Sequence, residues 1–70
     1  MLWYSVVSSN LVQVGYDPLS MSMVIRFHGG RVYEYDDVPP EEVEGLINAS
    51  SVGGYFHRHV KKRYTCRRLR

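Results

Sequence analysis

The alternation of apolar and polar residues in the middle of the chain predicts a pair of strands. From Met21 to Phe27 the odd-numbered residues are apolar and share one face, while Ser22, Val24 and Arg26 share the other. A period of two is expected of a strand with one buried face. Residues 28–30 (His-Gly-Gly) then predict a hairpin turn, because glycine tolerates positive φ. Residues 31–35 form its antiparallel partner, on which Tyr33 and Tyr35 share one face.

The residues before this hairpin extend the predicted sheet. Residues 11–16 are rich in strand-forming side chains, and residues 17–20 (Asp-Pro-Leu-Ser) favour a turn. The apolar residues 1–7 are interpreted as the start of a strand, with a break at residues 8–10, because they lack the basic region and cleavage site of a signal peptide. A small antiparallel sheet of three to four strands is therefore expected.

The periodicity changes after the sheet and predicts a first helix. Asp37 is a candidate N-cap, which the proline pair 39–40 can shift by a residue or two. The acidic residues that follow favour the positive end of the helix dipole, and the apolar stripe consists of Val43, Leu46 and Ile47. Gly45 weakens this helix by about 1 kcal/mol relative to alanine.

A second helix is predicted from apolar residues at a spacing of four. These residues are Val52, Phe56, Val60 and Tyr64. Arg58, Lys61 and Lys62 fall on a different side, so the helix is amphipathic with a basic outer surface. Residues 65–70 form a short basic tail, either an extra edge strand or a mobile segment. The expected fold is α+β, in the order β-β-β-α-α, with two helices packed on one face of the sheet.

Composition excludes several classes of protein. The 70 residues form a single domain, and a hydrophobic content of 44% is too high for a disordered chain. No apolar run is long enough to span a bilayer, so we expect no membrane partner. The single cysteine, Cys66, cannot form an internal disulfide, so a reducing, cytoplasmic location is expected. The small size argues against a deep catalytic cleft, and neither a cofactor nor an enzymatic activity is expected.

Charge is segregated along the chain. Six of the seven acidic residues lie between residues 34 and 44, and seven of the nine lysines and arginines lie between residues 58 and 70. Such asymmetry predicts an anionic partner for the basic end. The alternative is that the basic end folds back onto the acidic middle, and both can hold for one molecule.

The basic end and the tyrosine pair are the candidate nucleic-acid-binding residues. The phosphate-binding candidates are Arg58, Lys61, Lys62, Arg63, Arg67 and Arg68. Tyr33 and Tyr35 would stack on bases if their rings are exposed. The alternative, which we favour, is that both rings pack under the helices, because so small a core needs its aromatic residues.

Metal and catalytic chemistry is not indicated. His57 and His59 diverge on a helix, and no Cys-x-x-Cys or His-x-x-x-His spacing is present for a metal site. A Cys–His pair of His28 or these histidines with Cys66 is equally unsupported. Helix capping explains the clustered carboxylates better than acid–base catalysis.

The order of several segments resembles the KTSC domain, named for its occurrence at the C-terminus of some lysyl-tRNA synthetases. The segments are residues 14–17, 24–39, 49–56 and 60–64, with Tyr33-x-Tyr35 between a glycine turn and Val38-Pro39 as the central mark. The resemblance covers the chain from about residue 9. It implies a small stand-alone bacterial or phage protein, or an appended domain, in a family for which RNA binding has been suggested from context.

These observations predict a non-enzymatic module that binds RNA or another nucleic acid through its basic helix and tail. The alternative is a module for protein–protein interaction or self-association, in which the acidic middle and the basic end meet opposite patches on a partner. Exposure of Tyr33 and Tyr35 distinguishes the two hypotheses, because buried rings would leave only charge.

Overall fold

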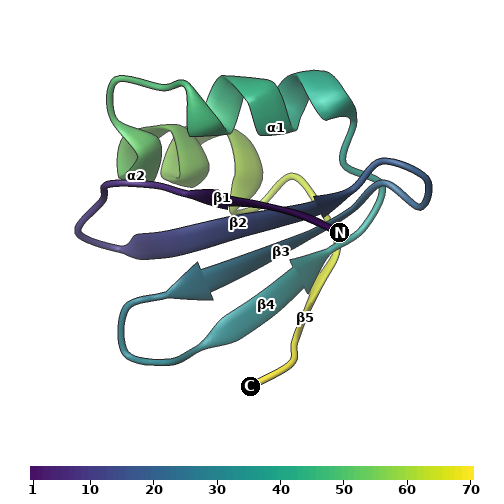
Figure 1. Cartoon of the computed structure of the whole chain (residues 1–70), viewed down its shortest axis with the longest axis horizontal. Coiled ribbons are helices and arrows are strands. Elements are labelled where there is room, and N and C mark those ends of the chain that lie inside the picture. The colour runs from purple at the N-terminus through teal and green to yellow at the C-terminus, as the bar shows by residue number, and fades with distance from the viewer.

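The chain folds into an antiparallel sheet with its helices on one side, as a computed structural model that describes all residues from Met1 to Arg70 shows (Figure 1). The strands are β1 (Leu2–Ser5), β2 (Leu11–Asp17), β3 (Ser22–Phe27), β4 (Val32–Tyr35) and β5 (Cys66–Arg68). The helices α1 (Pro40–Ile47), α2 (Val52–Tyr55) and η1 (Phe56–Val60) lie between β4 and β5 in the chain. The sheet has five strands in the order β1-β2-β3-β4-β5. The predicted α+β class is confirmed, but the sheet has five strands and not the expected three to four, because β1 and β5 both pair onto the central strands.

The pairing register sets which side chains face the helices. Val14 of β2 lies opposite Ile25 of β3, which in turn lies opposite Tyr33 of β4. Residues paired in this way share one face of the sheet, so the tyrosines of β4 face the helices as the alternation predicts. Met21 departs from the prediction, because it precedes β3, has a φ of 58° and is exposed.

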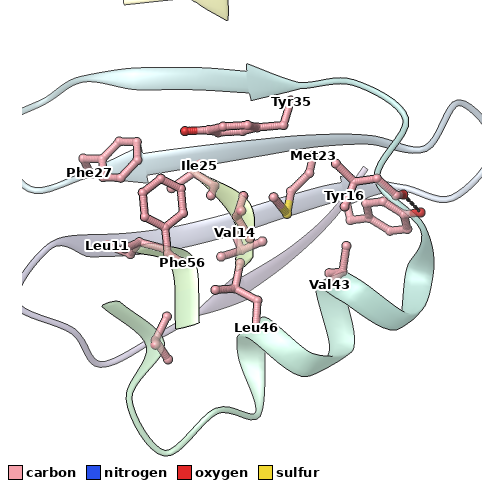
Figure 2. Packing of buried hydrophobic residues seen from close by; sticks show 13 residues of the cluster. Leu11, Val14, Tyr16, Met23, Ile25, Phe27, Tyr35, Val43, Leu46 and Phe56 are labelled. Carbon is pink, nitrogen blue, oxygen red and sulfur yellow. Dashed lines mark hydrogen bonds between the residues drawn. The ribbon is translucent and has the colours of Figure 1, made fainter. Parts of the chain in front are cut away.

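The turn before α1 is held over the sheet by Val38. The Val38 N–H donates to the Met21 carbonyl at 2.9 Å, and the Tyr16 hydroxyl donates to the Val38 carbonyl at 2.6 Å (Figure 2). Asp37 adopts a φ of 55° in this turn and is not the N-cap. The cap is Pro39, without a side-chain hydrogen bond, because the proline pair moves the start of the helix beyond the aspartate.

The second predicted helix is divided and shorter than expected. Four α-helical residues, Val52–Tyr55, are followed by the π-helical turn η1, in which the Lys61 N–H donates to the Phe56 carbonyl at 2.9 Å. Val52, Phe56 and Val60 are buried as predicted, but the helix ends at Val60 and does not continue to Tyr64. Phe56 and Val60, the first and last residues of this wider turn, both face the core.

One hydrophobic core fills the space between the sheet and the helices. Figure 2 shows Phe56 between the side chains of β2, β3 and β4, with Leu46 and Val43 of α1 beside them. The core residues are Leu11, Val14, Tyr16, Met23, Ile25, Phe27, Tyr35, Val38, Val43, Leu46, Val52, Phe56 and Val60. The opposite face of the sheet has no helix over it (Figure 1).

The basic tail is an edge strand. Cys66 pairs with Tyr35 and Arg68 with Tyr33, and the Leu69 N–H donates to the Val32 carbonyl at 2.7 Å. Of the two alternatives left open by the sequence, the extra strand is therefore correct. No helix in the structure is both long enough and apolar enough to span a membrane.

Candidate functional site

The two tyrosines of β4 occupy different environments. Tyr35 is 3% exposed and meets Phe56 edge to face, with ring centroids 6.0 Å apart. Burial is the main cause that raises the pKa of Tyr35 well above its ordinary value of 10.0. Tyr33 is only partly buried and meets Phe27 at 5.8 Å and 86°. The exposure that base stacking requires is therefore absent at Tyr35, which packs under the helices, and is present in part at Tyr33.

Both tyrosines line one surface hollow. It has a volume of about 260 Å³ and lies between strands β3–β5 of the sheet and the segment around η1. We call it the aromatic hollow; its lining residues are Asn10, Phe27, Arg31, Tyr33, Tyr35, Phe56, Lys61 and Cys66. Arg68 lies opposite Tyr33 in the β4–β5 register and so shares this face of the sheet. The site combines aromatic walls with cations at its margin.

The π-helical turn places Lys61 at this hollow. Phe56 begins η1 and is buried against Phe27 and Tyr35, at ring-centroid distances of 5.4 and 6.0 Å. The hydrogen bond from the Lys61 N–H to the Phe56 carbonyl closes the turn. The exposed Lys61 therefore lies one turn after Phe56, whose buried ring is part of the wall of the hollow. Turns of this type occur frequently at functional sites.

The cations of the basic end fall into two groups. Arg67 pairs with Glu34 and lies 3.7 Å from Asp36, and Arg63 lies 3.7 Å from Glu42. The basic end thus folds back in part onto the acidic middle, as one of the two alternatives predicted. The other cations of the candidate set have no carboxylate partner, and they are Arg58, Lys61, Lys62 and Arg68.

A buried carboxylate joins the helices to the segment before β5. Glu42 is 9% exposed, accepts hydrogen bonds from Tyr55 at 2.5 Å and from Tyr64 at 2.8 Å, and faces Arg63. Burial raises the pKa of Glu42, but these two hydrogen bonds and the charge of Arg63 outweigh it, so the pKa lies below its ordinary value. Sequence reasoning gave Glu42 only a helix-dipole role. Its spacing of four from Leu46, which puts it beside the apolar stripe, is the signal that identifies it.

The remaining candidate groups stay apart. His57 and His59 are exposed on η1, and Cys66 is a free, exposed cysteine. No group of three or more His, Cys, Asp or Glu side chains is close enough to hold a metal ion. Arg31, Phe27 and Phe56 line the aromatic hollow although the sequence analysis did not select them, because their proximity depends on tertiary packing.

The fold and site define a small α+β domain with one helical layer and an aromatic, basic surface hollow. Residues 7–64 match the model of the KTSC domain, and the chain belongs to this family. A KTSC domain protein from Yersinia pestis, known from its crystal structure, superposes with a TM-score of 0.90 at 30% identity, over 99% of this chain and 97% of that one.

Two kinds of curated relative share this domain. An uncharacterized protein of Stutzerimonas stutzeri is 39% identical over 57 residues, which are 81% of this chain and 80% of the relative. A lysine–tRNA ligase of Nostoc punctiforme is 36% identical over 61 residues, which are 87% of this chain but 11% of the ligase. The domain is thus found both in proteins of this size and as a small part of a much longer enzyme.

Proposed function

We propose that this protein is a non-enzymatic module that binds RNA or another nucleic acid at the aromatic hollow. The observation that carries the proposal is that Lys61 and Tyr33 line the same hollow, whose walls are aromatic. Nonspecific binding of single strands combines these two elements, a stacking surface for bases and cations for the phosphate backbone.

The roles of the residues follow from their exposure and pairing. Tyr33 is the stacking surface, and Tyr35 supports it from within the core. Lys61 lines the hollow, and Arg68 shares its face of the sheet opposite Tyr33. Arg58 on η1 and Lys62 in the following turn are further exposed cations that could hold phosphates. Arg63 and Arg67 contribute less, because Glu42, Glu34 and Asp36 already neutralise them.

The lysine–tRNA ligase relatives support this choice. Their name states that they act on tRNA, and a segment of three such ligases is similar to this chain. The segment covers 10 to 11% of each ligase, so the activity of the whole enzyme does not transfer to this chain.

The test is fluorescence anisotropy with labelled tRNA, single-stranded RNA and duplex DNA across a salt series. If three to four phosphates are neutralised, log K for single strands falls with log salt at a slope of about −2 to −3. Replacing Lys61 and Lys62 by glutamine is expected to weaken binding and to reduce the magnitude of that slope by about 1.4, if each lysine contacts one phosphate. A matched control is Leu19→Glu with Ser20→Glu, which changes net charge equally at an exposed turn far from η1 in the sequence.

Variants of Tyr33 test the contribution of base stacking separately from that of charge. Tyr33→Phe keeps the ring and is expected to bind as the unchanged protein does, whereas Tyr33→Ala is expected to lose about 1–3 kcal/mol of binding. The absence of binding at low salt, or equal weakening by the lysine variants and the control pair, would refute the proposal.

Protein interaction or self-association is the second candidate, and exposed apolar residues at the N-terminal edge favour it. Met1, Leu2 and Trp3 are 56, 53 and 45% exposed on or beside the edge strand β1. Such an edge can pair with a strand of a partner. Light scattering over a concentration series tests self-association, and a monomer mass at every concentration excludes it.

A further inference from the structure

A second hollow lies beside the turn between β3 and β4, and Arg26 and Val32 line it from the face of the sheet without helices. Its volume is about 210 Å³, and we call it the arginine hollow; its lining residues are Val12, Arg26, Phe27, Gly30, Arg31, Val32 and Arg70. Arg26 lies opposite Val32 in the register, on the face away from Tyr33. Three of the seven lining residues, Arg26, Arg31 and Arg70, have positively charged side chains, and none has an acidic one.

These arginines come from separate parts of the chain. Arg26 belongs to β3, Arg31 to the turn before β4, and Arg70 to the segment after β5. The backbone of Arg70 is fixed, because its N–H donates to the Val32 carbonyl at 3.2 Å and its carbonyl accepts from the Val32 N–H at 3.1 Å. The fold, rather than local sequence, thus brings the three side chains to one hollow.

No side-chain carboxylate pairs with the cations of the arginine hollow. The ion pairs of the structure involve Arg63 and Arg67, and none involves Arg26, Arg31 or Arg70. Glu34 and Asp36, the acidic residues of the neighbouring β4 segment, are both engaged by Arg67. Like charges that share a hollow repel each other, so a bound anion would stabilise this arrangement.

Aromatic rings position two of the guanidinium groups without neutralising them. Arg31 lies over Phe27, with its Cζ 5.3 Å from the ring centroid, and Arg26 lies over Trp3 at 5.4 Å. Trp3 in turn lies against Gly15, where a Cβ atom would be 2.7 Å from Trp3 Cζ3. These cation–π contacts restrict the conformations of the two arginine side chains and leave their N–H donors available to hydrogen-bond a ligand.

We infer that the arginine hollow is a binding site for a phosphate group. Guanidinium presents paired N–H donors that match two oxygens of a phosphate, and several such groups together favour a multiply charged anion over chloride. The inference goes beyond the proposed function, which uses the other face of the sheet. Arg31 lines both hollows, so a nucleic acid at Tyr33 would have a neighbouring phosphate within reach of this site.

The experiment is an NMR titration of the protein with sodium phosphate against sodium chloride at equal ionic strength and pH. Backbone amides and arginine Nε–H groups report the site. Saturable shifts centred on Arg26, Arg31 and Arg70 are expected with phosphate and not with chloride. Separate titrations with adenosine monophosphate and with a dinucleotide distinguish a terminal phosphate from a phosphodiester as its source.

Matched variants localise the effect. Arg26→Gln and Arg70→Gln are each expected to weaken phosphate binding about tenfold, the loss expected from one charge-assisted hydrogen bond. Leu19→Glu, with the same change of net charge at the exposed turn between β2 and β3, is the control and is expected to leave phosphate binding unchanged. Arg26→Lys keeps the charge but loses the paired donors, so weakened binding in this variant supports the guanidinium geometry even if a glutamine variant fails to fold.

The outcomes separate this inference from the proposed function. Shifts that do not saturate, or a Leu19→Glu variant as impaired as Arg26→Gln, overturn the phosphate site. Saturable phosphate binding at Arg26 and Arg70 in a protein that binds no RNA supports the site and refutes the proposed function. RNA binding without saturable phosphate binding supports the proposed function and overturns the phosphate site.

Discussion

Replacing Gly45 by alanine tests the packing of α1 against α2. Gly45 lies in α1, and a Cβ atom built on it would lie 2.8 Å from Tyr55 Cζ and closer still to the Tyr55 hydroxyl. The ring of Tyr55 is restrained, because its hydroxyl donates to Glu42 at 2.5 Å and its face lies against His59 at a centroid distance of 4.5 Å. The new methyl group must therefore displace a hydroxyl that is bound to a buried carboxylate.

Two opposing contributions decide the sign of the effect. Helix propensity favours alanine over glycine by about 1 kcal/mol. Losing a hydrogen bond to a charged group costs about 1.5–3 kcal/mol. The expected net result for Gly45→Ala is a loss of about 0.5–2 kcal/mol of unfolding free energy, although propensity alone predicts a gain.

The assay is urea denaturation followed by circular dichroism, with a comparison of midpoints at equal m-values. The control is the Tyr55→Phe background, in which neither the hydroxyl nor its hydrogen bond to Glu42 is present. There, the ring carbon Cζ still lies 2.8 Å from the new Cβ and must shift, but no hydrogen bond is lost, so Gly45→Ala is expected to destabilise the protein less than in the unchanged background. Stabilisation by Gly45→Ala in the unchanged background, or an equal effect in both backgrounds, would show that this reasoning is wrong.

Four further predictions concern stability, and urea denaturation at several pH values measures each of them. Because the pKa of Glu42 is lowered in the folded protein, its contribution to the free energy of unfolding is complete above pH 4.5, its ordinary pKa. This contribution is lost as pH falls through the folded pKa, and Glu42→Gln is expected to flatten the dependence of stability on pH in this range. Burial first, and then the hydrogen bond to Glu42, raise the pKa of Tyr64 to about 12. Its contribution to the free energy of unfolding is therefore complete below pH 10.0, is lost as pH rises toward 12, and is absent in Tyr64→Phe. Leu46→Ala empties a fully buried site and is expected to cost about 2–5 kcal/mol at any of these pH values. Cys66→Ser changes an exposed side chain and is expected to alter stability by less than about 0.5 kcal/mol, so a larger loss would contradict its surface position.

The elements with a strong local pattern could be predicted from the sequence. Alternation placed Met23, Ile25 and Phe27 on one face, and all three are buried in β3. The turn between β3 and β4 follows from local chemistry, since Gly29 and Gly30 adopt φ values of 95° and 93°. In such segments the residues that determine the structure are neighbours in the chain.

The features that the sequence did not settle depend on distant contacts. β5 is a strand because Cys66 reaches Tyr35, a pairing that no local pattern of three basic or polar residues specifies. The same alternation that put Tyr33 and Tyr35 on one face could not show that Phe56 covers only Tyr35 closely. The two hollows likewise collect residues from several strands and turns.

The chemistry of β5 has a consequence for how copies of this protein meet. β5 is an outer strand of the sheet, and an outer strand offers unpaired backbone groups to any other strand. Arg67 and Arg68 occupy this edge, so two copies that approach each other through β5 bring like charges together. Association through the β5 edge is therefore disfavoured, whereas the opposite edge, β1, carries no charged side chain and stays open to pairing.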